Sequence, residues 1–381
     1  MSALSERGLP EAASRRPLPP FTEKHERLRA ESRRFVAEEL RPPAREWEDA
    51  RWLPNDVFAR MAELGLLGLK YPRELGGRGG DHLDDAVLTE ELSRCGSGGV
   101  AAGIGAHIGI ATPPIWRFGS EGQKQRFLRP AISGEKIAAL GITEPGAGSD
   151  VAGLRTSARR VDGGYVVNGS KTFITNGVRA DFVVTAVKTT EQGGHHGLSF
   201  LIVERNSEGF EVSKKLEKLG WHASDTGELS FSDVFVPEEN LLGEENRGFY
   251  LVMANFGWER LVMALGAVAS MEALLERVLQ GAGSGSGRRH AVAEIAVKLE
   301  ASRCLTYHAL RLFAAGRSAI REVTEAKLLS QRAAFEAAET AFGLLDGEDE
   351  IARVLRDTRL GPIGGGTDEV MKEILGKQLG L

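Results

Sequence analysis

The sequence has very little cysteine. Its 381 residues include only Cys95 and Cys304, which lie far apart and have no further cysteine or histidine at metal-ligand spacing. Disulfide-stabilised domains and structural zinc sites both need several such ligands placed close together. The sequence therefore argues against both kinds of site, and we expect a metal-free protein of the reducing cytoplasm.

Long apolar runs are missing as well. A membrane-spanning helix needs about 20 consecutive apolar residues, and because no stretch approaches that length we expect no membrane span. An excess of positive charge is also absent, since 48 Lys and Arg stand against 53 Asp and Glu, for a formal net charge of -5. Nucleic acid is therefore not an expected partner, because binding to a phosphate backbone needs a basic surface.

Two segments carry no periodic pattern of apolar residues. Residues 1–20, MSALSERGLPEAASRRPLPP, lack the apolar middle of a secretory signal, and Glu6 and Glu11 argue against an organelle transit peptide. We expect this segment to be a disordered lead-in. Residues 281–287, GAGSGSG, have the composition of a flexible linker. No internal repeat is present.

The pattern of apolar residues divides the remaining chain into three regions. Residues 21–136 show helical spacing, as in Leu28, Phe35 and Leu40, and predict an N-terminal helical domain. Residues 137–240 contain short runs rich in β-branched and aromatic residues and predict a middle β-barrel or sandwich domain. Residues 241–381 contain three long amphipathic segments and predict a C-terminal domain resembling a four-helix bundle. The predicted fold class is therefore α+β, with several domains. The predicted strands are GYVVNGSKTFIT, DFVVTAVK, LSFLIVE, FEVSKK and ELSFSDVFVP.

The stretch LGITEPGAGSD, residues 140–150, stands where the helical pattern gives way to the strand pattern. Gly146, Gly148 and Ser149 would let backbone N–H groups converge on an anion, and Thr143 adds a hydroxyl donor. Pro, Gly, Ser and Asp are also the usual residues of surface turns. On its residues alone, this segment is either a phosphate or cofactor loop or a surface turn.

TEPGAGSD closely resembles the flavin-binding loop of the acyl-CoA dehydrogenases. The similarity continues through NGSKTFITNG, through GWHASDTGELSFSDVFVPEENLLGEENRGF, and through RDTRL followed by GGGTDEV, so that it runs from about Phe21 to the C-terminus. The resemblance implies the acyl-CoA dehydrogenase fold, with its domains in the same order as the three regions above. It also implies FAD held between the middle and C-terminal domains of a homodimer or homotetramer.

The resemblance further implies which residues contact FAD. These residues form four groups along the chain. The first group lies at the start of LGITEPGAGSD against the isoalloxazine, and the second lies near the end of that segment by the pyrophosphate. The third group flanks the flavin ring from a strand, and the fourth follows the C-terminal glycines. For the aromatic residue of the third group, a place in the core of the strand region is the ordinary alternative. The four groups are Leu140, Ile142 and Thr143; Gly148 and Ser149; Phe173, Ile174 and Thr175; and Thr367 and Glu369.

The catalytic base of this family is not at its most common place. Dehydrogenation of an acyl thioester removes a weakly acidic α-proton, and a desolvated carboxylate is suited to accept it. In most members a glutamate directly precedes the C-terminal Gly-Thr, but Gly364 and Gly365 stand there in IGGGTDEV. A minority, resembling the isovaleryl-CoA and long-chain acyl-CoA dehydrogenases, carries the glutamate before an arginine on a helix.

The segment MANFGWERLVMALG has this Glu-Arg pair at the matching place. We therefore predict Glu259 as the base, and Arg260 as a neighbour that orients it or contacts the substrate, although an exposed helix glutamate is the ordinary alternative. Gly365 and Gly366 are predicted to bind substrate, because a backbone N–H at this place bonds the thioester carbonyl in the family. No Walker-type lysine follows the glycines, which argues against a nucleotide cradle.

Two elements of the family pattern are missing. A segment that reaches the partner subunit's FAD usually follows the first long C-terminal helix, but QGAGSGSGRRH is too short to contain it. A second such loop is replaced by GLLDGEDEIAR, in which Asp346, Glu348 and Asp349 add negative charge where a phosphate would lie.

Three hypotheses about function remain open at the level of sequence. The first is FAD-dependent α,β-dehydrogenation of an acyl-CoA or acyl-carrier-protein thioester, with an electron acceptor such as electron-transfer flavoprotein. The second is redox-neutral α-proton chemistry on such a thioester, for example isomerisation or cyclisation. The third is a non-catalytic subunit that pairs with a competent relative. The visible spectrum of the protein with FAD and acyl thioesters discriminates among them.

Overall fold

The computed structural model describes residues 20–190, 194–281 and 285–381. Nearly all of the predicted disordered lead-in lies outside these residues, as do three residues of the glycine- and serine-rich linker. Within the described part, three groups of elements follow one another along the chain in the predicted order: helices, strands and helices again.

The first group consists of helices interrupted by π-helical turns. Helix α4 makes many of the contacts between the N-terminal helices and α9. It begins after Asp81, whose carboxylate accepts the backbone N–H of Leu83 at 2.7 Å and that of Asp84. Asp84 in turn accepts the backbone N–H of Asp81, so the two residues form a capping box that fixes where α4 starts. The helices are α1 (Glu23–Phe35), α2 (Ala44–Ala50), α3 (Asp56–Glu63), α4 (His82–Leu92), α5 (Gly98–Gly105), α6 (Thr112–Phe118), α7 (Glu121–Gln123) and α8 (Arg129–Ile132).

The strands form one sheet in the order β6-β7-β3-β2-β4-β5-β8, and β1 pairs with β4 in parallel. All five predicted strands are present. Three shorter strands were not predicted, because two of them are only two to four residues long and the third, SARRV, is mostly exposed and polar. The strands are β1 (Ala138–Gly141), β2 (Ser157–Val161), β3 (Gly164–Thr175), β4 (Phe182–Lys188), β5 (Leu198–Glu204), β6 (Phe210–Lys215), β7 (Thr226–Pro237) and β8 (Leu241–Leu242).

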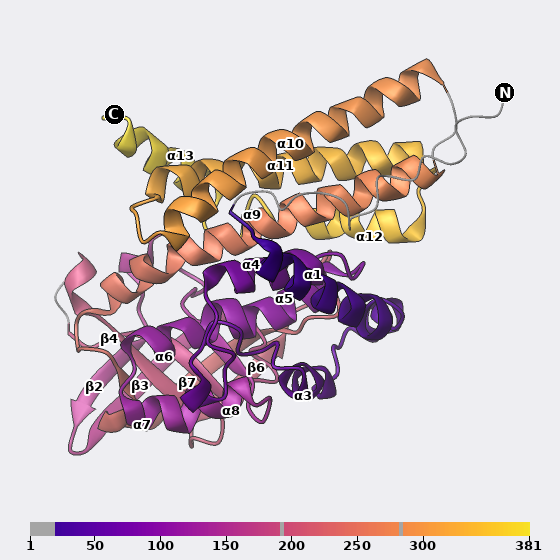
Figure 1. Ribbon diagram of the computed structural model, residues 1–381. Coiled ribbons are helices and arrows are strands. Elements are labelled where there is room, and N and C mark those ends of the chain that lie inside the picture. The colour runs from indigo at the N-terminus through magenta and orange to yellow at the C-terminus, as the bar shows by residue number, and fades with distance from the viewer. Residues whose placement is uncertain (1–19, 191–193, 282–284) are drawn as a thin grey trace.

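The last group is dominated by three long helices, as predicted. Figure 1 shows α10 and α11 on one side of α9, with the N-terminal helices and then the sheet on the other side. Trp258, Leu261 and Leu265 of α9 are buried in the same core as α4 and α5, so this helix joins the C-terminal bundle to the rest of the molecule. The helices are α9 (Gly248–Gly281), α10 (Ser286–Ala314), α11 (Ile320–Leu344), α12 (Asp349–Thr358) and α13 (Asp368–Gln378).

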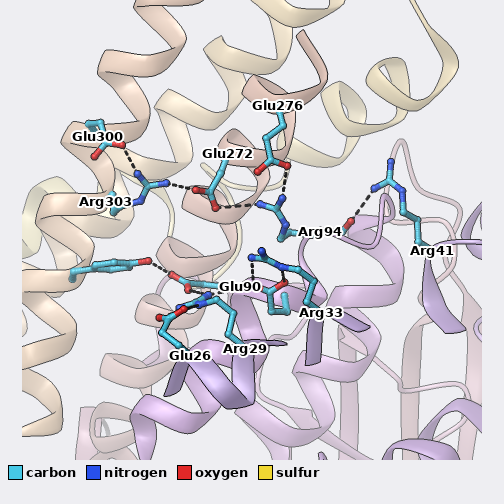
Figure 2. Close-up of polar contacts among 12 residues, drawn as sticks. Glu26, Arg29, Arg33, Arg41, Glu90, Arg94, Glu272, Glu276, Glu300 and Arg303 are labelled. Carbon is cyan, nitrogen blue, oxygen red and sulfur yellow. Dashed lines mark hydrogen bonds and ion pairs between the residues drawn. The ribbon is translucent and has the colours of Figure 1, made fainter. Parts of the chain in front are cut away.

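A network of ion pairs also fixes α9 against the N-terminal helices (Figure 2). Glu90 and Glu91 of α4 are buried, and arginines of α1 neutralise them, with Arg29 Nη1 lying 2.6 Å from Glu90 Oε2. Arg94, just after α4, reaches Glu272 of α9 at 3.1 Å. Because buried carboxylates are costly without such partners, the network specifies how α1, α4, α9 and α10 pack. Further pairs of the network are Arg29–Glu26, Arg29–Glu91, Arg33–Glu91, Arg94–Glu276, Arg303–Glu272 and Arg303–Glu300.

Candidate active site

Glu259 lies on the part of α9 that faces the N-terminal domain and the sheet. Its exposed fraction is 8%, so the alternative of an ordinary exposed helix glutamate is wrong. Asn255, one turn earlier, donates a hydrogen bond from Nδ2 to Glu259 Oε1 at 2.6 Å. Burial raises the pKa of Glu259 to about 7, while the Asn255 hydrogen bond and the charge of Arg260 oppose this rise. The carboxyl group is therefore held in one orientation and exchanges protons near neutral pH.

A small, largely apolar cavity lies in front of Glu259. Leu140 and Ile142, which were predicted to lie against the isoalloxazine, line it together with Asn255 and Glu259. The fold therefore brings the residues directly before the TEPGAGSD loop and the predicted base to one place, although they belong to different regions of the sequence. The other lining residues are Pro114, Phe200, Leu251 and Val252.

The C-terminal glycines form a tight loop beside the next turn of α9. Gly365 and Gly366 have φ angles of +64° and +96°, which favour glycine. A Cβ built at Gly365 would lie 2.4 Å from Sδ of Met263. The thioether of Met263 thus fills the space next to the position at which most family members carry a carboxylate. Among the described residues, neither the Gly365 nor the Gly366 N–H donates to a protein acceptor, which leaves both available to a ligand.

Arg260 lies next to this loop. Its exposed fraction is 5%, its Nε atom has no hydrogen-bond partner among the described residues, and its guanidinium lies over the Phe256 ring at 5.4 Å. A Cβ at Gly366 would lie 3.8 Å from Nη2 of Arg260. The predicted substrate-binding residues Arg260, Gly365 and Gly366 are therefore neighbours in the structure. A buried guanidinium with an unused donor needs a partner, and a bound ligand can supply it.

The TEPGAGSD loop is anchored by an ion pair that the sequence reasoning missed. Glu144 accepts the backbone N–H groups of Arg155 at 2.6 Å and of Thr156 at 2.9 Å. Lys171 of β3, fully buried, donates to Glu144 Oε1 at 2.8 Å and to the carbonyl of Ile142 at 3.1 Å. Burial lowers the pKa of Lys171 to about 8, which Glu144 opposes. The alternation of β3, which places Lys171 on the same face as Val167, was the available signal for this buried lysine.

Phe173 does not belong to the core of the sheet. Its exposed fraction is 68% and its φ is +59°, at an irregularity in the pairing of β3 with β7. The neighbouring Ile174 is buried and Thr175 half-buried. A non-glycine residue with a left-handed backbone is uncommon and often marks a functional site. An exposed aromatic side chain, together with half-buried Leu140 and Ile142, offers the apolar surface that a flat ring system such as isoalloxazine needs.

The other predicted cofactor residues lie nearer the surface. Gly148, Ser149 and Glu369 are exposed, and Thr143 is half-buried, with its carbonyl accepting the backbone N–H of Thr172 at 2.9 Å. Thr367 caps α13, because its hydroxyl accepts the backbone N–H of Val370 at 3.3 Å. Gly148, Ser149 and Glu369 are therefore accessible from solvent.

Residues 343–353, which stand in place of the second partner-facing loop, contain acidic residues that form ion pairs within the chain. Glu348 pairs with Arg277 of α9 at 2.6 Å, and Asp349 lies 3.4 Å from Arg45 of α2. The helix α9 ends at Gly281 and α10 begins at Ser286, which agrees with the shortened connection seen in the sequence. These acidic residues therefore have structural partners that do not involve a cofactor.

Three family models together match nearly the whole described chain. They are the acyl-CoA dehydrogenase N-terminal domain at residues 22–135, the middle domain at residues 139–234 and the C-terminal domain at residues 246–380. The chain belongs to the acyl-CoA dehydrogenase family. The resemblance and the three-domain architecture inferred from the sequence are confirmed, and so is the assignment to the oxidoreductases of this family.

Individual proteins extend this relationship. An acyl-CoA dehydrogenase of Bacillus subtilis is 36% identical over 373 residues, covering 94% of this chain and 98% of its own. A mitochondrial isovaleryl-CoA dehydrogenase of Arabidopsis thaliana is 36% identical over 363 residues, covering 91% of this chain and 88% of its own. A solved structure described as the FAD complex of PigA has a TM-score of 0.91 at 26% identity, covering 95% of this chain and 98% of its own. In the described part of this chain, no helix is long and apolar enough to cross a membrane.

Proposed function

We propose that the protein dehydrogenates an acyl thioester between Cα and Cβ to the trans-2-enoyl product, with Glu259 as the base and FAD as the cofactor. The observation that carries this proposal is the buried carboxyl of Glu259, which shares an apolar cavity with Leu140 and Ile142, directly before the TEPGAGSD loop. A carboxylate without water around it is a stronger proton acceptor than one in solution. The place of Glu259 before an arginine on a helix, as in the isovaleryl-CoA type, supports the same assignment.

The protein groups around the cavity divide the work of the reaction. Glu259 Oε2, which Asn255 leaves free, accepts the α-proton, and the Asn255 hydrogen bond to Oε1 fixes the orientation of the carboxylate. The free N–H of Gly365 donates to the thioester carbonyl and stabilises the negative charge that develops there. Bound FAD supplies the acceptor for the hydride that leaves the β-carbon. The apolar lining excludes water, which strengthens these electrostatic interactions.

The identity of the partners rests on the family relationship. FAD fits the exposed Phe173 ring and the half-buried Leu140 and Ile142, and the similar PigA structure holds FAD. The curated relatives are named for acyl-CoA substrates, which supports an acyl-CoA or the chemically equivalent acyl-carrier-protein thioester. We extend the proposal to electron-transfer flavoprotein as electron acceptor, to a homodimer or homotetramer, and to the cytoplasm, where the two free cysteines stay reduced.

One observation favours redox-neutral α-proton chemistry as a second candidate function. Glu348 and Asp349 form ion pairs within the chain, and the connection from Gly281 to Ser286 is short, at the two places where the family resemblance implies contacts with the partner's FAD. Isomerisation or cyclisation of a thioester uses the same Glu259 carboxylate and Gly365 N–H but transfers no hydride. A non-catalytic subunit, the third hypothesis, makes no use of the buried carboxyl.

The visible absorption spectrum tests these functions. The purified protein is titrated with FAD and then, without oxygen, with a series of acyl-CoAs. We expect a stoichiometric flavin band that a matching substrate bleaches. If the protein binds no FAD but exchanges the α-hydrogens of a thioester for deuterium, the result would support redox-neutral chemistry in place of dehydrogenation. A protein that does neither without a homologous partner is the non-catalytic subunit.

The rate of α-proton removal should depend on the ionisation of Glu259. Because burial raises the pKa of this carboxyl to about 7, the active carboxylate form is lost as the pH falls through that value. Below the pKa, the rate constant for flavin reduction should fall about tenfold for each pH unit. The measurement is the pH profile of anaerobic flavin reduction by stopped flow.

Asn255→Leu provides a second profile for comparison. The Asn255 hydrogen bond lowers the pKa of Glu259, so its removal should move the midpoint to higher pH. A midpoint that stays in place or moves to lower pH in Asn255→Leu would show that another group controls the profile.

A further inference from the structure

Lys327 of α11 is a fully buried lysine close to the glycine loop. Its exposed fraction is 0%, and its ammonium donates to the carbonyl of Gly366 at 2.7 Å. It has no carboxylate within ion-pair distance among the described residues. Burial lowers the pKa of Lys327 to about 8, which Asp368 opposes, so the amine is mostly protonated at neutral pH. Burying an ammonium group without a paired carboxylate is unfavourable. The hydrogen bond from Lys327 to the Gly366 carbonyl is therefore expected to have a role that offsets this cost.

The bond lies in a glycine-rich loop with few other hydrogen bonds among the described residues. On one side of the loop, Gly364 N–H donates to the Leu360 carbonyl at 2.9 Å, and on the other side Asp368 N–H donates to the Pro362 carbonyl at 3.0 Å. The three glycines from Gly364 to Gly366 have no side chains to restrict them. Among the described residues, Lys327 is the only side chain that hydrogen-bonds to any of the three. It therefore limits the orientations available to the peptide groups around the free N–H of Gly365.

Other contacts of α11 and α9 act on the same small region. Gln331, one turn after Lys327, donates from Nε2 to the carbonyl of Met263 at 2.6 Å. The sulfur of Met263 in turn packs against Gly365, and the Arg260 guanidinium packs against Gly366. The glycine loop is thus enclosed by α9 and held from α11, and two positive charges, those of Arg260 and Lys327, lie beside it. Fixed positive groups at this place favour negative charge on a nearby oxygen.

We propose that Lys327 is a positioning residue that holds the glycine loop so that the Gly365 N–H meets the carbonyl oxygen of the substrate thioester. This inference rests on the proposed function, because it assigns the Gly365 N–H to the thioester carbonyl. Lys327 acts through the backbone and does not itself touch the substrate. Small displacements of a positioned group are enough to lose much of its effect on rate.

Lys327→Met tests the proposal, because methionine fills similar space without a donor. Lys327→Gln keeps a donor on a shorter side chain. The matched control is Lys298→Met, which removes a lysine of α10 that pairs with Glu336 at the surface, at 2.7 Å. Three quantities are measured for each variant: the thermal midpoint, kcat and KM with a matching acyl-CoA, and the rate of α-hydrogen exchange in D₂O. For the exchange, 3-thiaoctanoyl-CoA is used, because its β-position is sulfur and offers no hydride.

In Lys327→Met we expect kcat and the exchange rate to fall together by about 10²-fold, as for other misplaced catalytic groups. KM should change much less, Lys327→Gln should recover part of both rates, and Lys298→Met should match the wild type. Wild-type rates in Lys327→Met would overturn the proposal, as would losses in both Lys327 variants that only follow a lowered thermal midpoint. A wild-type protein that neither exchanges α-hydrogens nor reduces FAD would instead refute the proposed function itself.

Discussion

Glu259→Gln should reduce the rate of α-proton removal by about 10²–10⁴-fold, the usual contribution of a positioned general base. Glutamine has nearly the same shape as glutamate and can still accept the Asn255 hydrogen bond through its amide oxygen. It cannot accept a proton at neutral pH. The expected result is therefore a protein that is folded and binds FAD but is bleached very slowly by acyl-CoA and exchanges α-hydrogens very slowly.

Glu276→Gln is a suitable control for this experiment. Glu276 lies on the same helix, α9, and pairs with Arg94 at the contact with the N-terminal domain (Figure 2). Its substitution removes the same charge from the same helix at a distance from the cavity, so it should leave the rate of bleaching near that of the wild type. Full activity in Glu259→Gln would refute the assignment of the base. Equal losses in both variants would point to a general effect of charge or stability.

The order of domains was predictable because it depends on local patterns. Long amphipathic helices such as α9, α10 and α11 repeat their apolar residues many times, and β3 and β7 are each twelve residues long and contain runs of β-branched and aromatic residues. Shorter elements such as β1 and β8 offer too few positions for any period to be recognised. The turn and bulge near Phe173 were not predictable for a related reason. Alternation assigns a strand residue to one face, but a left-handed φ turns its side chain out of that pattern.

The candidate site was predicted in part. Glu259 and Arg260 were proposed because the glutamate missing before Gly366 coincides with a Glu-Arg pair on a helix, and both side chains are buried. Contacts between distant segments gave no such signal. The packing of Met263 on Gly365, the ion pair of Lys171 with Glu144 and the bond from Lys327 to Gly366 each join residues whose proximity only the folded chain establishes. These contacts position the groups that the sequence motifs name.

Gly365→Ala should reduce the rate of dehydrogenation by about 10²–10³-fold, the usual loss when an oxyanion donor is removed. The new Cβ would lie 2.4 Å from Met263 Sδ, a contact that neither group tolerates. The φ of +64° is also unfavourable for alanine, by about 1–2 kcal/mol. Both effects move the Gly365 N–H away from the thioester carbonyl, while the FAD-contacting loop and Phe173 are unchanged. Flavin content, kcat and the exchange rate of 3-thiaoctanoyl-CoA measure these effects separately.

Two further variants separate the steric contact from the backbone strain. Met263→Ala combined with Gly365→Ala removes the clash but keeps the left-handed alanine, so it should recover part of the lost rate. Gly364→Ala is the matched control, because its Cβ would meet only ordinary contacts, the nearest being Leu360 Cγ at 3.7 Å. It should stay close to wild-type activity. If Gly365→Ala retained the wild-type rate, the Gly365 N–H would not be the donor to the thioester carbonyl. If the double variant recovered nothing, backbone strain rather than the Met263 contact would explain why this position is glycine.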